Sequence, residues 1–177
     1  MFRDLSPLAE LAPEICGDFD LRIDRAGAWH YRGSPIGRPA LVKLFARVLR
    51  READGSYWLV TPVERGRVTI DDVPFVAVDV AFTQTQAGPR ATFTTNLDDS
   101  VAAGPAHKIR TALQSDGSVV PYIDVRNGLE ARIERAAFYR LIDGATVEDG
   151  RLGIRSDGVF FDLGPADAAT GDAELGA

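Results

Sequence analysis

Arginine and aromatic side chains near position 126 form the first candidate site for an anion. Tyr122, Arg126 and Arg132 flank Asn127, where a predicted strand ends and a helix is expected to begin. A phenol, two guanidiniums and the N–H groups of a helix start could together hold a phosphate or carboxylate. This group is therefore predicted to bind an anionic ligand.

A purely structural role for the same residues stays open. Asn127 and Glu130 have the spacing of a capping box, in which the Asn127 side chain would be used by the helix. Arg126 could likewise form an ion pair with Asp124 or Glu130. In that case these side chains would support the fold and bind nothing.

The first half of the chain offers a second candidate group at a similar strand-to-helix region. It consists of Trp29, Tyr31 and Arg38, whose aromatic members could stack on a base, although aromatic residues more often pack in a core. Glu64 follows a predicted strand and is added as a ligand contact, with a place on the polar rim as the alternative. These four residues complete the predicted ligand-binding set.

Known catalytic and metal-binding motifs are absent from the sequence. It contains no dinucleotide fingerprint, phosphate-binding loop, zinc-protease motif or serine nucleophile elbow. Cys16 is the only cysteine, and His30 and His107 lie in predicted strands. We expect no metal and no cofactor, and a protein that is more plausibly a binding module than an enzyme.

Charge and hydropathy exclude several other classes. The net charge of −6 over 177 residues opposes non-specific binding to nucleic acid, and no apolar run is long enough to span a membrane. Asp4 and Glu10 interrupt any secretory signal, which favours a cytoplasmic location. Between residues 25 and 51 there are seven basic residues and no acid, which predicts a basic helix face at Lys43, Arg47 and Arg51.

Periodicity predicts two principal helices among many short strands. Apolar residues recur at helical spacing after Pro39 and again over 127–143, and a shorter helix is expected to begin at Ser6. The remaining chain alternates with the period of a strand. The predicted strands are 20–24, 29–31, 57–63, 68–71, 75–83, 90–95, 107–113, 119–125, 152–155 and 159–163.

These elements predict an α+β fold with a mostly antiparallel sheet. A strand–bend–helix–strand order recurs at a spacing of about 90 residues, which suggests a duplicated motif. We therefore expect an N-terminal helical segment over 1–17, a first repeat over 18–104 and a second repeat over 105–164. Residues 165–177 hold acids, no base and few bulky side chains, so a disordered acidic tail is predicted.

Several linked stretches resemble one known family. GAWHYRGSPI, LVKLFARVLRREADGSYWLVTPVE, VPFVAV and VPYIDVRNGLEARIERAAFYRL are similar to the proteobacterial domain of unknown function family 1285 (DUF1285), over residues 14–164. This resemblance implies a duplicated α+β core whose second half resembles a pleckstrin homology domain. It also implies a cleft between the halves that holds a nucleotide-like ligand in a signalling role, and it transfers no catalytic residue.

The function expected from the sequence is non-catalytic binding of a small anionic ligand, nucleotide-like or phosphorylated, in a sensory module. Two alternatives stay open. A protein-interaction domain would use exposed sheet edges and the basic helix. An enzyme of undefined chemistry would require the fold to bring His30, Glu64 and Tyr122 together.

Overall fold

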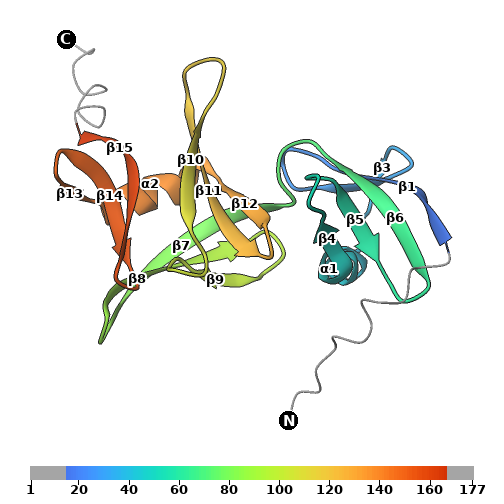
Figure 1. Cartoon of the computed structure of the whole chain (residues 1–177), viewed down its shortest axis with the longest axis horizontal. Coiled ribbons are helices and arrows are strands. Elements are labelled where there is room, and N and C mark those ends of the chain that lie inside the picture. The colour runs from blue at the N-terminus through green and yellow to red at the C-terminus, as the bar shows by residue number, and fades with distance from the viewer. Residues whose placement is uncertain (1–14, 167–177) are drawn as a thin grey trace. The chain divides into compact units, whose positions relative to one another are not determined.

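The computed structural model of the chain describes residues 15–166 and is shown in Figure 1. The chain forms two compact units, Met1–Pro74 and Phe75–Ala177. Within residues 15–166, most of each unit is sheet and each unit contains one helix, so the α+β class predicted from the sequence is confirmed. No helix in the described part of the chain has the length and hydrophobicity that a membrane span requires.

The N-terminal unit is a six-stranded sheet with one helix on its face. The strands are β1 (Ile15–Ile23), β2 (Trp29–Tyr31), β3 (Ser34–Pro35), β4 (Leu49–Arg51), β5 (Tyr57–Val60) and β6 (Glu64–Ile70). Their order across the sheet is β3-β2-β1-β6-β5-β4, and only β1 and β6 run parallel. Helix α1 (Pro39–Val48) has Pro39 in its first turn, as predicted, and turns Val42 and Ala46 into the core.

The C-terminal unit contains a second six-stranded sheet, one helix and a small third sheet. Its elements are β7 (Phe75–Thr85), β8 (Gly88–Thr95), β9 (Ser100–Ala102), β10 (Ile109–Leu113), β11 (Val119–Arg126), β12 (Leu129–Ile133), α2 (Arg135–Asp143), β13 (Thr146–Glu148), β14 (Arg151–Ser156) and β15 (Val159–Pro165). The large sheet has the order β10-β11-β12-β7-β8-β9, and β13-β14-β15 form the small one. Helix α2 packs against β7 and β14 through buried Ala137 and Leu141.

The two large sheets share one topology. When the strands of each sheet are numbered along the chain, both have the order 3-2-1-6-5-4, with the first and last strands parallel at the centre. The hairpin between the fourth and fifth strands is also repeated: Asp54 Oδ1 accepts hydrogen bonds from the amide and hydroxyl of Ser56, and Asp116 Oδ1 does the same for Ser118. The expected duplication is therefore present.

The repeated element is the six-stranded sheet and not the predicted strand–helix–strand motif. Helix α1 stands between the third and fourth strands of its sheet, whereas α2 follows the sixth strand. The boundary also differs, because β7–β9 pair in one sheet with β10–β12. The division after Pro74 thus replaces the expected one after residue 104.

The helix predicted over 127–143 is wrong in its first part. Asn127 and Gly128 have φ values of 48° and 73° and form the tight turn of the β11–β12 hairpin, as Asn-Gly commonly does. Leu129 and Ile133 alternate with polar neighbours along β12, so the segment has a strand period as well as a helical one. The helix begins only at Arg135, and its cap residue is Glu134, so the predicted capping box is not formed.

The predicted terminal segments are described only in part. Residues 15–17, the last part of the segment expected to be helical over 1–17, belong to strand β1 instead. The short helix expected from Ser6 lies outside the described residues. At the other end β15 continues to Pro165, and residues 167–177 of the predicted tail again lie outside the described part.

Candidate functional site

A largely apolar cavity of about 640 Å³ opens between α1 and the sheet of the N-terminal unit. Its size is typical of a small-molecule site, and most of its wall is hydrophobic. The apolar lining residues are Phe19, Leu21, Pro35, Ile36, Leu41, Phe45, Val48 and Leu59. The polar ones are Tyr31, Ser34, Arg38, Thr61 and Glu64.

One wall of the cavity depends on an irregularity in β1. The parallel pairing of β1 with β6 shifts register between Asp18 and Leu21, and Asp20 has a positive φ of 51°. Such a bulge redirects side chains, and here the ring of Phe19 lies against the backbone of Gly66. Gly66 provides this space because a Cβ built there would lie 2.0 Å from Phe19 Cδ2. The glycine in the middle of β6 therefore allows Phe19 to form the wall.

Gly66→Ala tests this packing. The added methyl group would displace the Phe19 ring, and overpacking of this kind typically costs about 1–3 kcal/mol of unfolding free energy. Gly17, the partner of Gly66 across the β1–β6 pair, is a matched control because a Cβ there meets nothing within 4 Å. Urea unfolding of both variants is the measurement. Equal losses at Gly17 and Gly66 would contradict the proposed contact.

Three of the predicted ligand contacts lie around this single cavity. Tyr31, Arg38 and Glu64 come from β2, the start of α1 and the start of β6, and all of them line it. Trp29 does not: it is 2% exposed and its ring packs 6.1 Å from that of Phe45. Trp29 is thus a core residue beneath the site, which agrees with the alternative that these aromatic residues pack in a core.

The two charged lining residues are available for a ligand. Arg38 and Glu64 are exposed, and among residues 15–166 neither side chain has a hydrogen-bond or ion-pair partner. A guanidinium can bind a carboxylate or phosphate through paired N–H groups, and a carboxylate accepts hydrogen bonds from N–H and O–H donors. The polar rim can therefore bind one end of an amphipathic molecule whose apolar body fills the cavity.

The second predicted group lies in the C-terminal unit and forms no helix-start site. Tyr122 is 3% exposed, faces Arg132 across the β11–β12 pair and carries the Arg110 guanidinium 4.3 Å above its ring. The Arg126 guanidinium lies 5.0 Å from the ring centre of Phe75. No helix begins beside Arg126, so the predicted convergence with helix N–H groups is wrong.

Ion pairs around Arg126 also differ from the expected ones. Arg126 Nη1 lies 3.5 Å from Oδ2 of Asp99, a partner that was not predicted. The carboxylate of Glu130 accepts two hydrogen bonds from Arg110, at 2.6 and 2.7 Å. The long sequence separation of these partners explains why local spacing could not predict them.

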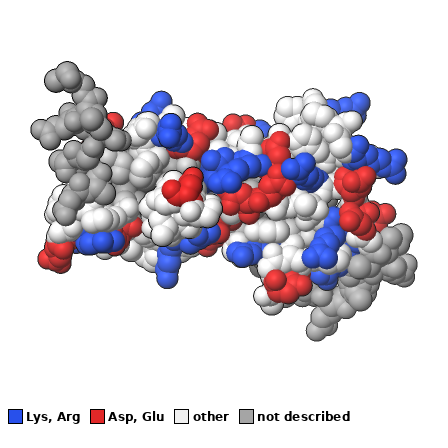
Figure 2. All heavy atoms as spheres, turned by 90° about the horizontal axis from the view of Figure 1, so that it is seen from above, with Lys and Arg blue, Asp and Glu red and all other residues white. Residues whose placement is uncertain are grey.

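The basic residues expected on one helix face are divided between two elements. Lys43 and Arg47 belong to α1, whereas Arg51 lies in β4 with its guanidinium 5.7 Å from the Tyr57 ring centre. On the face of the molecule drawn in Figure 2, basic and acidic side chains are interspersed. The structure thus does not form the predicted three-residue basic helix face.

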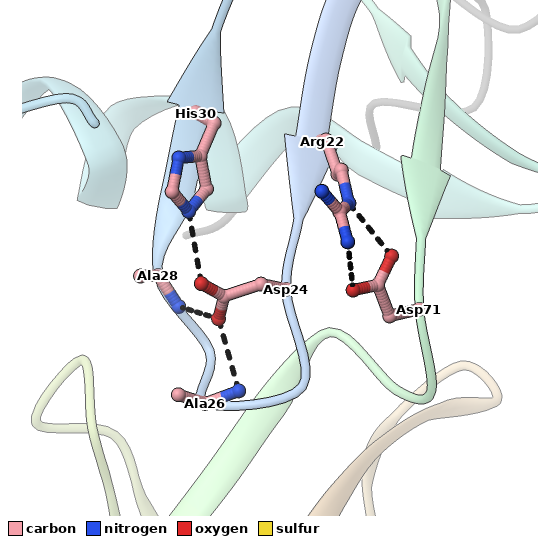
Figure 3. Close-up of polar contacts among 6 residues, drawn as sticks. All are labelled: Arg22, Asp24, Ala26, Ala28, His30 and Asp71. Atoms are coloured by element: carbon pink, nitrogen blue, oxygen red, sulfur yellow. Dashed lines mark hydrogen bonds and ion pairs between the residues drawn. The ribbon is translucent and has the colours of Figure 1, made fainter. Parts of the chain in front are cut away.

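His30 lies on the sheet face opposite the cavity. Leu21 and Tyr31 are cross-strand partners that both line the cavity, and the adjacent pair Arg22 and His30 therefore points the other way. There, as Figure 3 shows, Asp24 accepts a 2.9 Å hydrogen bond from His30 Nε2. Glu64 lines the cavity, so the sheet separates two of the three residues that the enzyme alternative would need to lie together.

Asp24 also supports the β1–β2 turn, which makes the unit sensitive to acid. Its carboxylate accepts hydrogen bonds from the amides of Ala26 and Ala28 at 2.9 and 3.0 Å. The hydrogen bond from His30 is the main cause that lowers the pKa of Asp24 below its ordinary value of 3.8, with the two amides contributing. The pKa of Asp24 is therefore lower in the folded state than in the unfolded state. The ionised carboxylate stabilises the fold at pH values above the unfolded-state pKa, and this contribution is lost as the pH falls through the folded-state pKa.

We expect this dependence to appear in acid unfolding. The wild type should lose stability as the pH falls below about 4, and Asp24→Asn should show a smaller loss over that interval. The measurement is the unfolding free energy from urea titrations between pH 2 and 7. Identical pH profiles for the two proteins would contradict the assigned role of Asp24.

No three His, Cys, Asp or Glu side chains within residues 15–166 gather closely enough to hold an ion.

Sequence reasoning missed the apolar half of the site. Phe19 and Gly66 are far apart in the chain, and nothing in the spacing shows that one packs on the other. A glycine inside a strand often marks a close approach of another group, but Gly66 falls between the predicted strands 57–63 and 68–71, so this sign was not available.

Comparison with known proteins identifies both units. The N-terminal domain of DUF1285, a domain of unknown function, matches residues 6–73, and the C-terminal domain of the same family, also of unknown function, matches residues 74–163. The match boundary coincides with the structural division near Pro74. No curated protein matches the chain.

Two crystal structures are similar to the chain. One is of a DUF1285 family protein from Silicibacter pomeroyi DSS-3, with 43% identity and a TM-score of 0.85 over 96% of this chain and 93% of that one. The other is of a DUF1285 family protein from Shewanella baltica OS155, with 28% identity and a TM-score of 0.54 over 70% of this chain and 90% of that one.

Proposed function

The chain belongs to the DUF1285 family, and we propose that its N-terminal unit binds a small anionic ligand without transforming it. The observation that carries this proposal is the cavity between α1 and the sheet, which combines apolar walls with Arg38 and Glu64 on its rim. Ligand sites are typically of this kind, mostly hydrophobic with a few polar groups that orient the ligand. Tyr31, Arg38 and Glu64 are the proposed polar contacts.

The chemistry of the lining favours an amphipathic ligand. Arg38 would bind a phosphate or carboxylate, and Glu64 would accept hydrogen bonds from an amino or hydroxyl group. The rings of Phe19, Tyr31 and Phe45 would contact a planar or aliphatic body. A nucleotide-like or phosphorylated metabolite, as expected from the sequence, has these features. We place it within the N-terminal unit, and not between the repeats, because the proposed contacts line a cavity there.

A binding role is favoured over catalysis by the set of groups at the cavity. Among the described lining residues, only Tyr31, Arg38 and Glu64 are titratable, and no histidine or cysteine is among them. General acid–base catalysis usually needs a positioned pair of such groups. A sensory role in signalling, and the likeness of the second half to a pleckstrin homology domain, remain predictions that follow from the resemblance.

A thermal-shift screen tests the proposal. The panel comprises nucleoside monophosphates, sugar phosphates, and aromatic and aliphatic carboxylates, each paired with a neutral analogue. A ligand present at one hundred times its dissociation constant should add about 2.7 kcal/mol of stability. We expect at least one anionic compound to stabilise the protein more than its neutral analogue. A flat response across the panel would remove the support for a small-ligand site.

A further inference from the structure

Strand β11 in the C-terminal unit extends past the end of its neighbour β12. It pairs with β10 from Val119 to Ile123, whereas its pairing with β12 reaches only to Tyr122, which faces Arg132. Within the described chain, Val119 and Val120 therefore have a strand neighbour on one side only, whereas Pro121 stands opposite Ile133, the last residue of β12, and has no N–H to donate. Figure 1 shows the β10–β11 hairpin projecting past the end of β12.

One residue of this segment, Val119, directs both its backbone N–H and its carbonyl toward the open side. The Gln114 amide donates to the Ser118 carbonyl at 2.7 Å, and the Asp124 amide donates to the Lys108 carbonyl at 3.0 Å. Residues of an antiparallel strand alternate between their two neighbours, so the even-numbered residues from 118 to 124 bond with β10. Val119 consequently turns its N–H and carbonyl away from β10. An unpaired strand edge of this kind can pair with another extended chain.

A hollow of about 360 Å³ lies beside this edge. It is bounded by Ser118 and β11 residues 119–121, the end of β12 and the first turns of α2, including Tyr139. Large apolar groups here are open to solvent: Val119 is 49% exposed, Tyr139 is 59% exposed, and Leu113, the cross-strand partner of Val119, is 76% exposed. Exposed hydrophobic residues around a concave site are typical of binding surfaces.

The charge of the hollow is positive. Arg132 and Arg135 line it, and no aspartate or glutamate does. Arg135 is exposed and has no ion pair among residues 15–166. In a chain with a net charge of −6, this local excess of guanidinium favours an acidic partner.

We propose that this hollow binds an extended acidic peptide segment, which is added as a strand beside β11. Successive side chains of an added strand would point to opposite faces of the sheet. One face offers the apolar surface of Val119, the other offers Arg132, and Arg135 from the first turn of α2 adds a second guanidinium to the same hollow. The partner segment therefore alternates apolar and acidic residues, and its backbone bonds with Val119. This recognition mode combines main-chain hydrogen bonds for affinity with side-chain pockets for specificity.

A labelled peptide of alternating residues, fluorescein-Glu-Val-Glu-Val-Glu-Val-amide, tests the proposal by fluorescence anisotropy on the full chain. We expect saturable binding that is lost for the Lys-Val counterpart and for the same Glu-Val sequence N-methylated at all backbone amides. Arg135→Gln should weaken binding about tenfold, because a charge-assisted contact is removed. Arg140→Gln, on the same helix but outside the hollow, is the matched control and should bind as the wild type does.

Each alternative outcome overturns the proposal. Absence of saturable binding up to millimolar peptide would exclude this ligand class. Equal binding of the N-methylated peptide would show that no strand is added, and equal weakening by both arginine variants would show a non-specific charge effect. The peptide controls leave the protein unchanged, so they decide the question even where a variant alters folding.

Discussion

Arg38→Gln is expected to weaken binding of the anionic ligand about ten- to hundredfold while the unfolding free energy stays nearly constant. The loss corresponds to a charge-assisted hydrogen bond of about 1.5–3 kcal/mol. Stability should change little because Arg38 is exposed and has no polar partner within residues 15–166. Isothermal titration of the compound found in the thermal-shift screen, with urea unfolding of the same variant, separates the two effects.

Arg47→Gln provides the matched control for this experiment. Arg47 is also an exposed arginine of the α1 region, but it does not line the cavity. We expect its affinity to equal that of the wild type. If Arg38→Gln binds as tightly as Arg47→Gln does, then the rim arginine is not a ligand contact and the anionic part of the proposal fails.

Ser156→Ala is expected to produce the largest loss of stability among the polar substitutions considered. The Ser156 hydroxyl is fully buried, accepts a 2.9 Å hydrogen bond from the Ala91 amide and donates a 2.6 Å one to the Ala103 carbonyl. It thereby joins the small β13–β15 sheet to the large sheet. Removing it leaves two buried backbone groups without a partner, at a cost of about 1–3 kcal/mol each.

Ser118→Ala is the corresponding control because it removes a hydroxyl from an exposed turn. The Ser118 hydroxyl donates to Asp116, but solvent can replace that bond. Surface changes of this type usually fall within about 0.5 kcal/mol. Urea unfolding of both variants is the measurement, and an equal loss in the two would contradict the buried connection through Ser156.

The elements were predictable where one period dominated the sequence. The sequence of residues 76–82 alternates with a strand period, and β7 forms there even though a bulge between Ala77 and Asp79 interrupts its pairing with β8. Helix α1 carries a single apolar stripe after Pro39. Residues 129–133 satisfy both a helical and a strand period, and the turn at Asn127-Gly128 decides for the hairpin. The boundary between the two units could not be predicted in this way. It depends on the pairing of β7 with β12, which joins segments far apart in the chain.

The polar half of the candidate site was predictable and the apolar half was not. Tyr31, Arg38 and Glu64 could be proposed from residue type and position next to predicted elements. The wall formed by Phe19 depends on the β1 bulge and on the absent side chain of Gly66, which are tertiary features. The predicted role of Arg126 depended on a helix start that does not form beside it.

Amide chemical-shift mapping tests the location of the ligand most directly. The compound from the thermal-shift screen is titrated into uniformly ¹⁵N-labelled protein, and shifts are followed for both units in one spectrum. The proposal predicts that the perturbed amides belong to Tyr31, Ser34, Arg38, Thr61 and Glu64 and their neighbours around the cavity. Perturbations confined to residues 75–166, with none at the cavity, would contradict a ligand site in the N-terminal unit.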